Sequence, residues 1–201
     1  MKVLLKYFVY VFVALLIVAG LGTGVYAYFG GFKSIEVEHV KCVGPYIAFK
    51  HYKGDYRKSY EAMREVQNFL KTEMKIDDSD MGTGIGVYFD VPGTIDVKDQ
   101  RSVVGYTLTE EQYERFPAND KGIYKAKLGY TDVVYSEFPY KGKPSFIMAV
   151  FKIYPAFQKY LKENSISPNA SVEIYDMEGR KIEVYIPVDM SYQSMEKALG
   201  A

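Results

Sequence analysis

Glutamate and tyrosine side chains occupy alternate positions, with β-branched residues between them, along two short segments near the C-terminus. Residues 171–176 and 181–187 show the alternation of β-strands, and the turn residues of Met177-Glu-Gly-Arg180 between them predict a hairpin. Alternate residues of a strand point to the same face of a sheet. We therefore predict one face that carries two carboxylates and two phenols, Glu173, Tyr175, Glu183 and Tyr185. The β-branched residues between them are expected on the other face, under helices: Val172, Ile174, Ile182, Val184 and Ile186.

Carboxylates set among aromatic rings bind flat, apolar or cationic molecules. Cation–π attraction alone contributes about 0.5–2 kcal/mol to such binding. Matching positions in the first half of the chain extend the predicted face with Val87, Phe89, Val104 and Tyr106. The predicted ligand-binding residues are Glu173, Glu183, Tyr175, Tyr185, Tyr106 and Phe89. The alternative is an ordinary solvated strand face.

The elements that must position these residues occur in the same order in two halves, 46–109 and 123–189. Hydrophobic periodicity predicts a strand at 46–52, an amphipathic helix at 57–75, and strands at 85–90 and 102–108. The second half repeats this order with a strand at 128–138, a helix at 144–162 and the hairpin. Thr109 is expected to cap a short helix. Pro155 is expected to kink or restart the helix that contains it.

Short sequence words repeat at equivalent places in the two halves. Tyr52-Lys-Gly54 matches Tyr140-Lys-Gly142, and Tyr88-Phe-Asp90 matches Ile174-Tyr-Asp176. These matches favour an internal duplication. We predict an α+β fold in which two duplicated β-α-β-β units form one antiparallel sheet with two helices on one face. The other face would then be left as a groove.

Composition and motif spacing exclude several other classes of function. The formal net charge is zero, so no nucleic-acid partner is expected. His39, Cys42 and His51 match no standard zinc spacing, so neither a metal nor another cofactor is expected. Gly82-Thr-Gly-Ile-Gly86 precedes a strand and lacks the Lys-Ser/Thr ending of a phosphate loop. No Gly-x-Ser-x-Gly elbow occurs, and no catalytic residue is assigned.

Residues 7–29 contain no charged side chain. A membrane-spanning helix needs about 20 apolar residues, so residues 1–31 are predicted to be a transmembrane anchor. A cleavable signal peptide is the alternative, with Val25-Tyr-Ala27 as its cleavage site. Residues 32–45 would connect the anchor to a folded domain at 46–189, followed by a short C-terminal tail at 190–201. Lys2 and Lys6 before the apolar segment, against Lys33 after it, leave the side of the membrane nearly undecided.

The duplicated order, closed by Glu173-Ile-Tyr175 and Glu183-Val-Tyr-Ile-Pro-Val188, resembles the GyrI-like small-molecule-binding domain of the SOUL/GyrI-like superfamily. The resemblance covers about residues 36–188, and Tyr56, Tyr60 and Gly105 also fit it. It implies a groove between the halves that receives hydrophobic, often cationic, ligands against a buried glutamate. That role carries over to Glu173 first and Glu183 second.

A membrane span followed by a GyrI-like domain further resembles the N-terminal part of the animal testis-expressed ER-phagy receptor family. In that family the domain is cytosolic, and a long disordered tail binds autophagy proteins. The sequence ends at Ala201 without such a tail, so the autophagy role is not carried over. We expect a membrane-anchored, non-catalytic domain that binds a hydrophobic or cationic small molecule and contacts membrane lipid through its N-terminal helix. A membrane-tethered adaptor for a protein partner and a small-substrate hydrolase with a carboxylate as general base are the alternatives.

Overall fold

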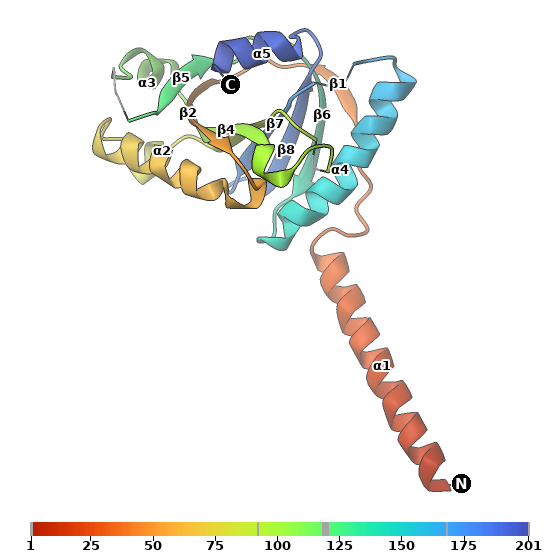
Figure 1. Ribbon diagram of the computed structural model, residues 1–201. Coiled ribbons are helices and arrows are strands. Elements are labelled where there is room, and N and C mark those ends of the chain that lie inside the picture. The colour runs from red at the N-terminus through yellow and green to blue at the C-terminus, as the bar shows by residue number, and fades with distance from the viewer. Residues whose placement is uncertain (1, 92, 118–120, 168, 201) are drawn as a thin grey trace.

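An antiparallel sheet of eight strands forms the scaffold of the domain (Figure 1). The computed structural model describes residues 2–91, 93–117, 121–167 and 169–200. The strands are β1 (Glu38–Lys41), β2 (Tyr46–Lys53), β3 (Gly84–Tyr88), β4 (Arg101–Leu108), β5 (Tyr124–Lys127), β6 (Asp132–Pro139), β7 (Ser171–Asp176) and β8 (Lys181–Pro187). The helices are α1 (Lys2–Tyr28), α2 (Tyr60–Thr72), α3 (Glu110–Glu114), α4 (Pro144–Glu163) and α5 (Tyr192–Leu199). The predicted α+β fold is confirmed.

Two β-α-β-β units meet in the middle of this sheet. The first consists of β2, α2, β3 and β4, and the second of β6, α4, β7 and β8. In the sheet order β1-β6-β8-β7-β3-β4-β2-β5, the second unit mirrors the first, and β7 pairs with β3 where they join. The predicted duplication is therefore confirmed, and β3 and β7 are its two central strands.

Helices α2 and α4 cover the same face of the sheet, as predicted. Residues that lie opposite each other in neighbouring strands share a face. One such row crosses the sheet through Ala48, Tyr106, Gly84, Tyr175, Ile182 and Phe138. Its first end packs with Val66 and Leu70 of α2, and its other end with Ile153 and Phe157 of α4. The centre of the row, on β3 and β7, lies between the two helices.

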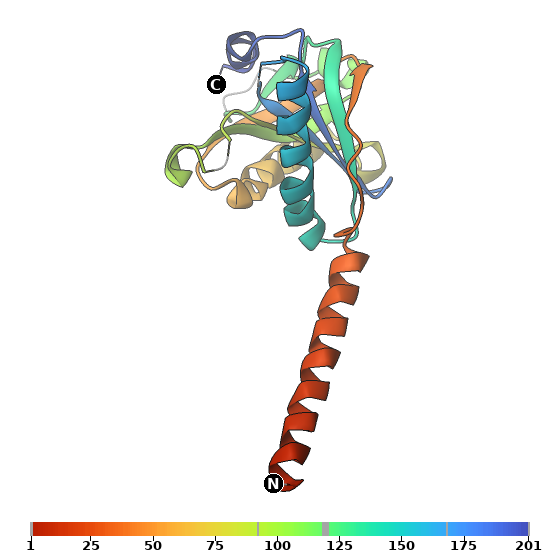
Figure 2. The same ribbon diagram turned by 90° about the vertical axis from the view of Figure 1, so that its right-hand side faces the viewer.

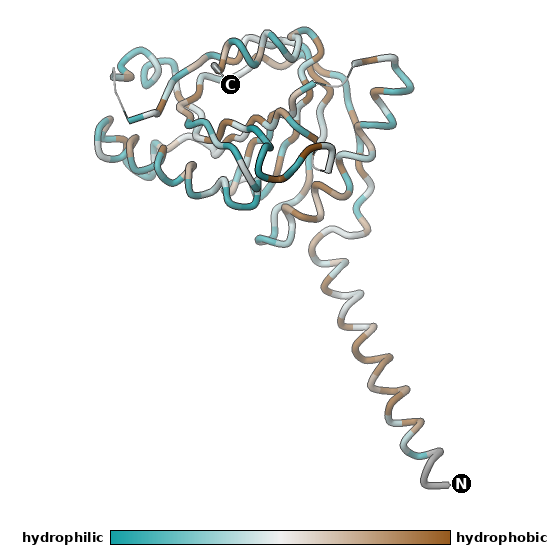
Figure 3. The backbone as a smooth tube through the Cα atoms, in the orientation of Figure 1, coloured by the Kyte–Doolittle hydropathy of each residue, from teal (hydrophilic) through white to brown (hydrophobic). Residues whose placement is uncertain are grey.

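Helix α1 extends away from the domain (Figure 2). Within its segment Lys6–Tyr28, the most apolar 18-residue window has a mean hydropathy of 2.4 and is 0% buried. Figure 3 shows that hydrophobic residues predominate along it. Within the described residues, this helix is long and apolar enough to span a membrane. A signal sequence passes the same test of length and composition, so membrane anchoring stays a prediction.

The two ends of the sheet are joined to each other. β1 leads into β2 through residues 42–45, and β5 leads into β6 through residues 128–131. Backbone hydrogen bonds connect these segments: Gly44 N–H donates to the Tyr130 carbonyl at 2.9 Å, and Leu128 N–H donates to the Pro45 carbonyl at 3.0 Å. The sheet therefore curls on itself, and the face opposite α2 and α4 becomes an inner surface.

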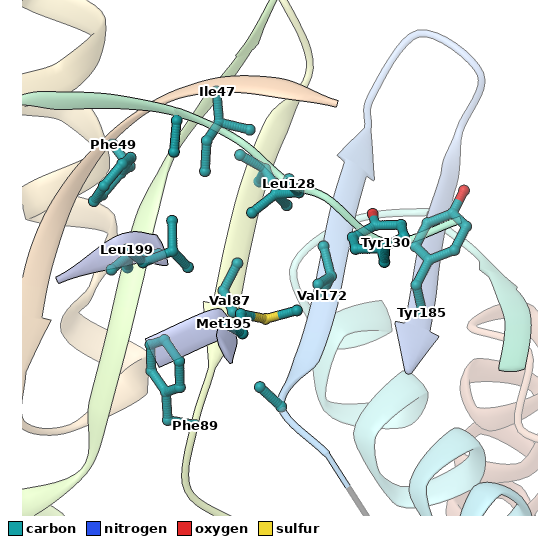
Figure 4. Close-up of a cluster of buried hydrophobic side chains, with 14 of the residues drawn as sticks. Ile47, Phe49, Val87, Phe89, Leu128, Tyr130, Val172, Tyr185, Met195 and Leu199 are labelled. Atoms are coloured by element: carbon teal, nitrogen blue, oxygen red, sulfur yellow. The ribbon is translucent and has the colours of Figure 1, made fainter. Parts of the chain in front are cut away.

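Helix α5 covers part of that inner surface, so the prediction of a groove on the face opposite α2 and α4 is wrong. Met195 and Leu199 of α5 are buried and pack with Val87 and Phe89 of the central strand region (Figure 4). Apolar residues three and four positions apart give α5 one hydrophobic side. Residues within the predicted tail at 190–201 thus form a helix that completes a core.

Two further local predictions can be compared with the structure. The strand predicted at 128–138 begins at Asp132, because residues 128–131 run between the two ends of the sheet. Helix α4 continues through Pro155 instead of restarting. Pro155 removes the hydrogen bond to the Phe151 carbonyl, which belongs to an exposed residue and can bind water instead. Thr109 caps α3 as predicted.

The packing of α5 leads to a stability prediction. Replacing the fully buried Met195 by alanine leaves a cavity, so we expect Met195→Ala to lower the free energy of unfolding by roughly 2–5 kcal/mol. Chemical denaturation of the full-length chain in mild detergent measures this change. Gln193→Ala, on the exposed side of the same helix, is the control and should shift stability by less than about 0.5 kcal/mol. Equal effects of the two variants would show that α5 is not part of the core.

Candidate functional site

Glu173 lies at the centre of the helix-covered face, where the two units join. In the register of the sheet it faces Gly86 on β3 and Val184 on β8. Strand β3 presents only Gly84 and Gly86 on this stretch of the face, so the backbone beside Glu173 carries no side chains. The Tyr88 ring occupies that space: a Cβ atom on Gly86 would lie 2.7 Å from it. The glycines of β3 therefore make room for aromatic rings around a carboxylate.

Tyrosine hydroxyls hold both oxygens of the Glu173 carboxylate. Tyr154 of α4 donates to Oε1 at 2.6 Å, and Tyr175 of β7 donates to Oε2 at 2.9 Å. Tyr88 and Tyr175 hydroxyls are 2.6 Å apart, and those of Tyr154 and Ser171 are 2.8 Å apart. Each phenol has one proton. With Tyr175 donating to an ionised Glu173, Tyr88 must donate to Tyr175, and Ser171 to Tyr154. The hydroxyl protons are thus directed toward the carboxylate.

Glu173 is 9% exposed as a residue, and its carboxylate is held in the described structure by phenols, not by cationic side chains. Burial raises the pKa of Glu173, and the hydrogen bonds from Tyr154 and Tyr175 oppose this shift without cancelling it. Burial, and then the nearby carboxylate, hold the pKa values of Tyr154 and Tyr175 well above the usual range. The phenols therefore remain protonated donors, and the charge of an ionised Glu173 is left without a counter-ion.

Further aromatic rings enclose this group of polar atoms. Tyr56, just before α2, packs on Tyr88 with ring centroids 4.8 Å apart. Phe146 of α4 packs edge-on against Tyr175 at 5.5 Å. We call Glu173, Tyr88, Tyr154, Tyr175, Tyr56 and Phe146 the Glu173 site. Its residues come from β3, β7, α4 and the segment before α2, so both halves of the duplication contribute.

The six residues predicted to share one face are divided between two. Glu173, Tyr175 and Tyr106 lie on the helix-covered face, whereas Glu183, Tyr185 and Phe89 lie on the inner face. Strands β7 and β8 pair Glu173 with Val184 and Ile174 with Glu183. Alternation within each strand was predicted correctly, but the prediction that the two strands carry their acids on one face was wrong.

Glu183 is part of a separate polar group on the inner face of the sheet, on the strand next to β7. Lys181 Nζ lies 2.6 Å from Glu183 Oε1, and the Tyr135 hydroxyl donates to the same oxygen at 3.3 Å. The rings of Tyr135 and Tyr185 are 5.1 Å apart. Glu183 therefore already has a cationic partner. Phe89 packs against Tyr192 of α5 and belongs to the inner core.

Four residues of the Glu173 site were not among the predicted ligand-binding residues: Tyr88, Tyr154, Phe146 and Tyr56. Tyr88 shares strand parity with Gly84 and Gly86, and two glycines in one strand are a sequence sign of close approach. Tyr154 lies on the side of α4 that faces the sheet. The helical period of the sequence would have placed Tyr154 on that side. Within the described ranges, no group of three or more His, Cys, Asp and Glu residues is arranged to hold a metal ion.

Solved structures with this arrangement define the class of fold. The C-terminal domain of EcmrR superposes with a TM-score of 0.54 at 10% identity, covering 77% of this chain and 98% of that one. EcmrR in a complex with DNA superposes with a TM-score of 0.53 at 10% identity, covering 93% and 71%. At this identity the likeness concerns the fold alone. The domain has the GyrI-like fold.

A relative among curated proteins is found by sequence. The chain is 30% identical over 119 residues to the testis-expressed protein 264 homolog of Mus musculus, a match that covers 51% of this chain and 38% of that protein. The homology is weak, and the matched part spans well under half of the relative. No family model matches the chain.

The raised pKa of Glu173 predicts how stability depends on pH. The folded chain holds the Glu173 proton at pH values where the unfolded chain, with a pKa near 4.5, has lost it. The contribution of Glu173 to stability should therefore fall as the pH rises from about 4.5 through its raised folded pKa. Glu173→Gln removes this titration. We expect it to raise the free energy of unfolding at pH 7.5 by about 1–3 kcal/mol, the usual cost of an incompletely satisfied buried group.

Chemical denaturation at several pH values between 4.5 and 8 measures this difference. The advantage of Glu173→Gln should shrink toward pH 4.5, where the folded wild-type chain is protonated. A wild-type chain that is the more stable of the two at pH 7.5 would contradict the account of an uncompensated buried carboxylate.

Proposed function

We propose that this chain is a membrane-anchored domain that binds a hydrophobic, cationic small molecule between α2 and α4, with Glu173 as the counter-charge. The observation that carries this proposal is a buried carboxylate whose hydrogen-bond donors in the described structure are phenols. A buried charge without a partner is costly. A bound cation would supply that partner, whereas a purely structural role would be served as well by an uncharged residue.

The residues around Glu173 favour an aromatic or otherwise apolar cation. Tyr88, Tyr175, Tyr56 and Phe146 offer ring faces and edges within one small volume. Cations are attracted to ring faces, most strongly where water is excluded. These rings pack over Glu173 in the described structure, so a ligand must displace at least one of them. Binding then selects a conformation in which the rings have parted.

Tyr88 is the ring best placed to move. Its hydroxyl bonds to Tyr175, which can bond to Glu173 without it. The Tyr56 hydroxyl, in contrast, is bonded to the backbone carbonyls of Asp90 and Arg101 at 3.2 and 2.9 Å. An outward rotation of Tyr88 would open space above Gly86 and leave Tyr56 as a fixed stacking surface.

Ligand binding can be tested with tetraphenylphosphonium as a lipophilic cation and triphenylphosphine oxide as a neutral analogue. We expect saturable binding of the cation to the full-length chain, measured by calorimetry with the heat of empty micelles subtracted. The neutral analogue should bind more weakly. Glu173→Gln should weaken binding of the cation tenfold or more, about 1.4 kcal/mol, because it removes the buried charge.

Glu183→Gln is the matched control for this experiment. It makes the same change, carboxylate to amide, at the other predicted acid. Glu183, however, lies on the opposite face and is paired with Lys181. Binding should be unchanged in this variant. No saturable binding, or an equal loss in both variants, would refute the proposed site.

The anchor part of the proposal rests on α1. Its apolar side chains are exposed along the whole segment Lys6–Tyr28, which needs an apolar environment. Tyr7, Tyr10, Tyr26 and Tyr28 lie near its two ends, where aromatic residues favour the membrane interface. A spanning helix is therefore a better account of α1 than an exposed helix in water.

Retention of the N-terminus tests the anchor. We expect the chain isolated from cells to keep its N-terminal peptide by mass spectrometry and to remain in the membrane pellet at alkaline pH. Leu15→Lys with Leu16→Lys places two charges mid-helix, at a cost of about 2.5–3.5 kcal/mol each, and should release the chain. The conservative pair Leu15→Ile and Leu16→Ile should not. A mature chain that begins at Tyr28 would establish a cleaved signal peptide instead.

A further inference from the structure

The outer side of α4 changes character along its length. Its first half exposes apolar residues: Ile147 is 60% exposed, Val150 40% and Phe151 73%. Two turns further on, the same side exposes polar residues, including Gln158 and Lys162. A solvent-facing helix surface is normally polar throughout. The first half of α4 therefore has a surface suited to an apolar or interfacial environment.

This apolar half of α4 lies beside the point where α1 ends. Lys152 directly follows the exposed Phe151 in the sequence, and its Nζ donates to the Gly31 carbonyl at 2.5 Å. Lys141 Nζ lies 4.9 Å from the centre of the Tyr28 ring. In Figure 2, α4 starts next to the end of α1 and runs away from it. The hydrophobicity of the exposed side thus decreases with distance from the end of α1.

Basic residues surround the apolar ones. Lys141 and Lys143 are exposed in the turn before α4. Phe32, 67% exposed, adds a further aromatic ring next to Lys33. We call Phe32, Ile147, Val150, Phe151, Lys141 and Lys143 the α4 surface. Aromatic and aliphatic residues with a lysine rim are the composition of helices that lie in a membrane interface.

We propose that the α4 surface docks onto the anionic surface of the bilayer that α1 enters, so that the domain lies against the membrane in one fixed orientation. This inference rests on the proposed anchor. The tether holds the surface within reach of the lipid, so even a weak interfacial affinity leads to docking. Lysines near an anionic surface contribute about 1 kcal/mol each. The headgroup layer is about 5–8 Å deep on each side, enough to receive the first turns of α4.

Docking has a consequence for the Glu173 site. The side of α4 that faces the sheet carries Phe146 and Tyr154, which form part of that site. One helix then contacts lipid on one side and encloses the carboxylate on the other. The site is held next to the phase in which hydrophobic cations concentrate, so a ligand reaches it from the bilayer surface.

Site-directed fluorescence tests the docking. The full-length chain with Cys42→Ser is placed in nanodiscs of phosphatidylcholine and phosphatidylserine, and an environment-sensitive dye is attached at Phe151→Cys or at Gln158→Cys. Gln158 is the matched control, since it lies two turns further along the same exposed side of α4. We expect the dye at 151 to shift to shorter wavelength and to be quenched severalfold more by headgroup-level spin-labelled lipid than the dye at 158.

Charge reversal tests the choice of an anionic surface. Lys141→Glu with Lys143→Glu should reduce quenching at 151 at least twofold. Equal, weak quenching at 151 and 158, or quenching at 151 that charge reversal leaves unchanged, would overturn the proposal. Failure of the anchor is distinguished by flotation: a chain that does not float with liposomes refutes the anchor, whereas a floating chain with an unquenched dye refutes docking alone.

Discussion

The pairing of β3 with β7 is the constraint on which the rest of the structure depends. It joins the two units at equivalent strands and places Glu173 opposite Gly86. Because Gly86 has no side chain, the Tyr88 ring can lie over β3 and reach Tyr175. Because α2 and α4 cover opposite halves of the same face, the rings lie between two helices and water is kept from the carboxylate. The raised pKa of Glu173 follows from this enclosure.

The fold could be predicted from the sequence because its determinants are local and repeated. The helical period at 57–75, the alternation at 171–187 and the matching words of the two halves each follow from neighbouring residues. Helix α5 could not be found that way, since Met195 and Leu199 alone do not distinguish a packed helix from a tail. The division of 124–139 into β5 and β6 depends on partners far away in the sequence, β2 on one side and β8 on the other.

The site was predicted only in part. The sequence of strand β7 shows the acidic and phenolic side chains, but it does not show which face of the sheet they occupy. Asp176 pairs with Lys181 across a loop of four residues, so odd-numbered residues of β7 face even-numbered residues of β8. A loop with an even number of residues always has this effect in an antiparallel hairpin without a bulge. The predicted turn Met177–Arg180 has that length, and applying the rule would have separated Glu173 from Glu183. The helical period places Tyr154 on the side of α4 that faces the sheet, but its contact with Glu173 depends on how α4 packs against β7.

The three-dimensional arrangement also alters the charge balance around α1. Along the sequence, Lys2 and Lys6 at the start of the helix exceed Lys33 after it, which favours a cytosolic N-terminus. In the folded chain, Lys141 and Lys152 join Lys33 at the far end of α1. Anionic lipids are concentrated in the cytoplasmic leaflet, and their attraction acts on the folded surface rather than on the sequence. The proposed docking of the α4 surface would therefore favour a cytosolic domain, the placement that the family resemblance implies and the linear charge count opposes.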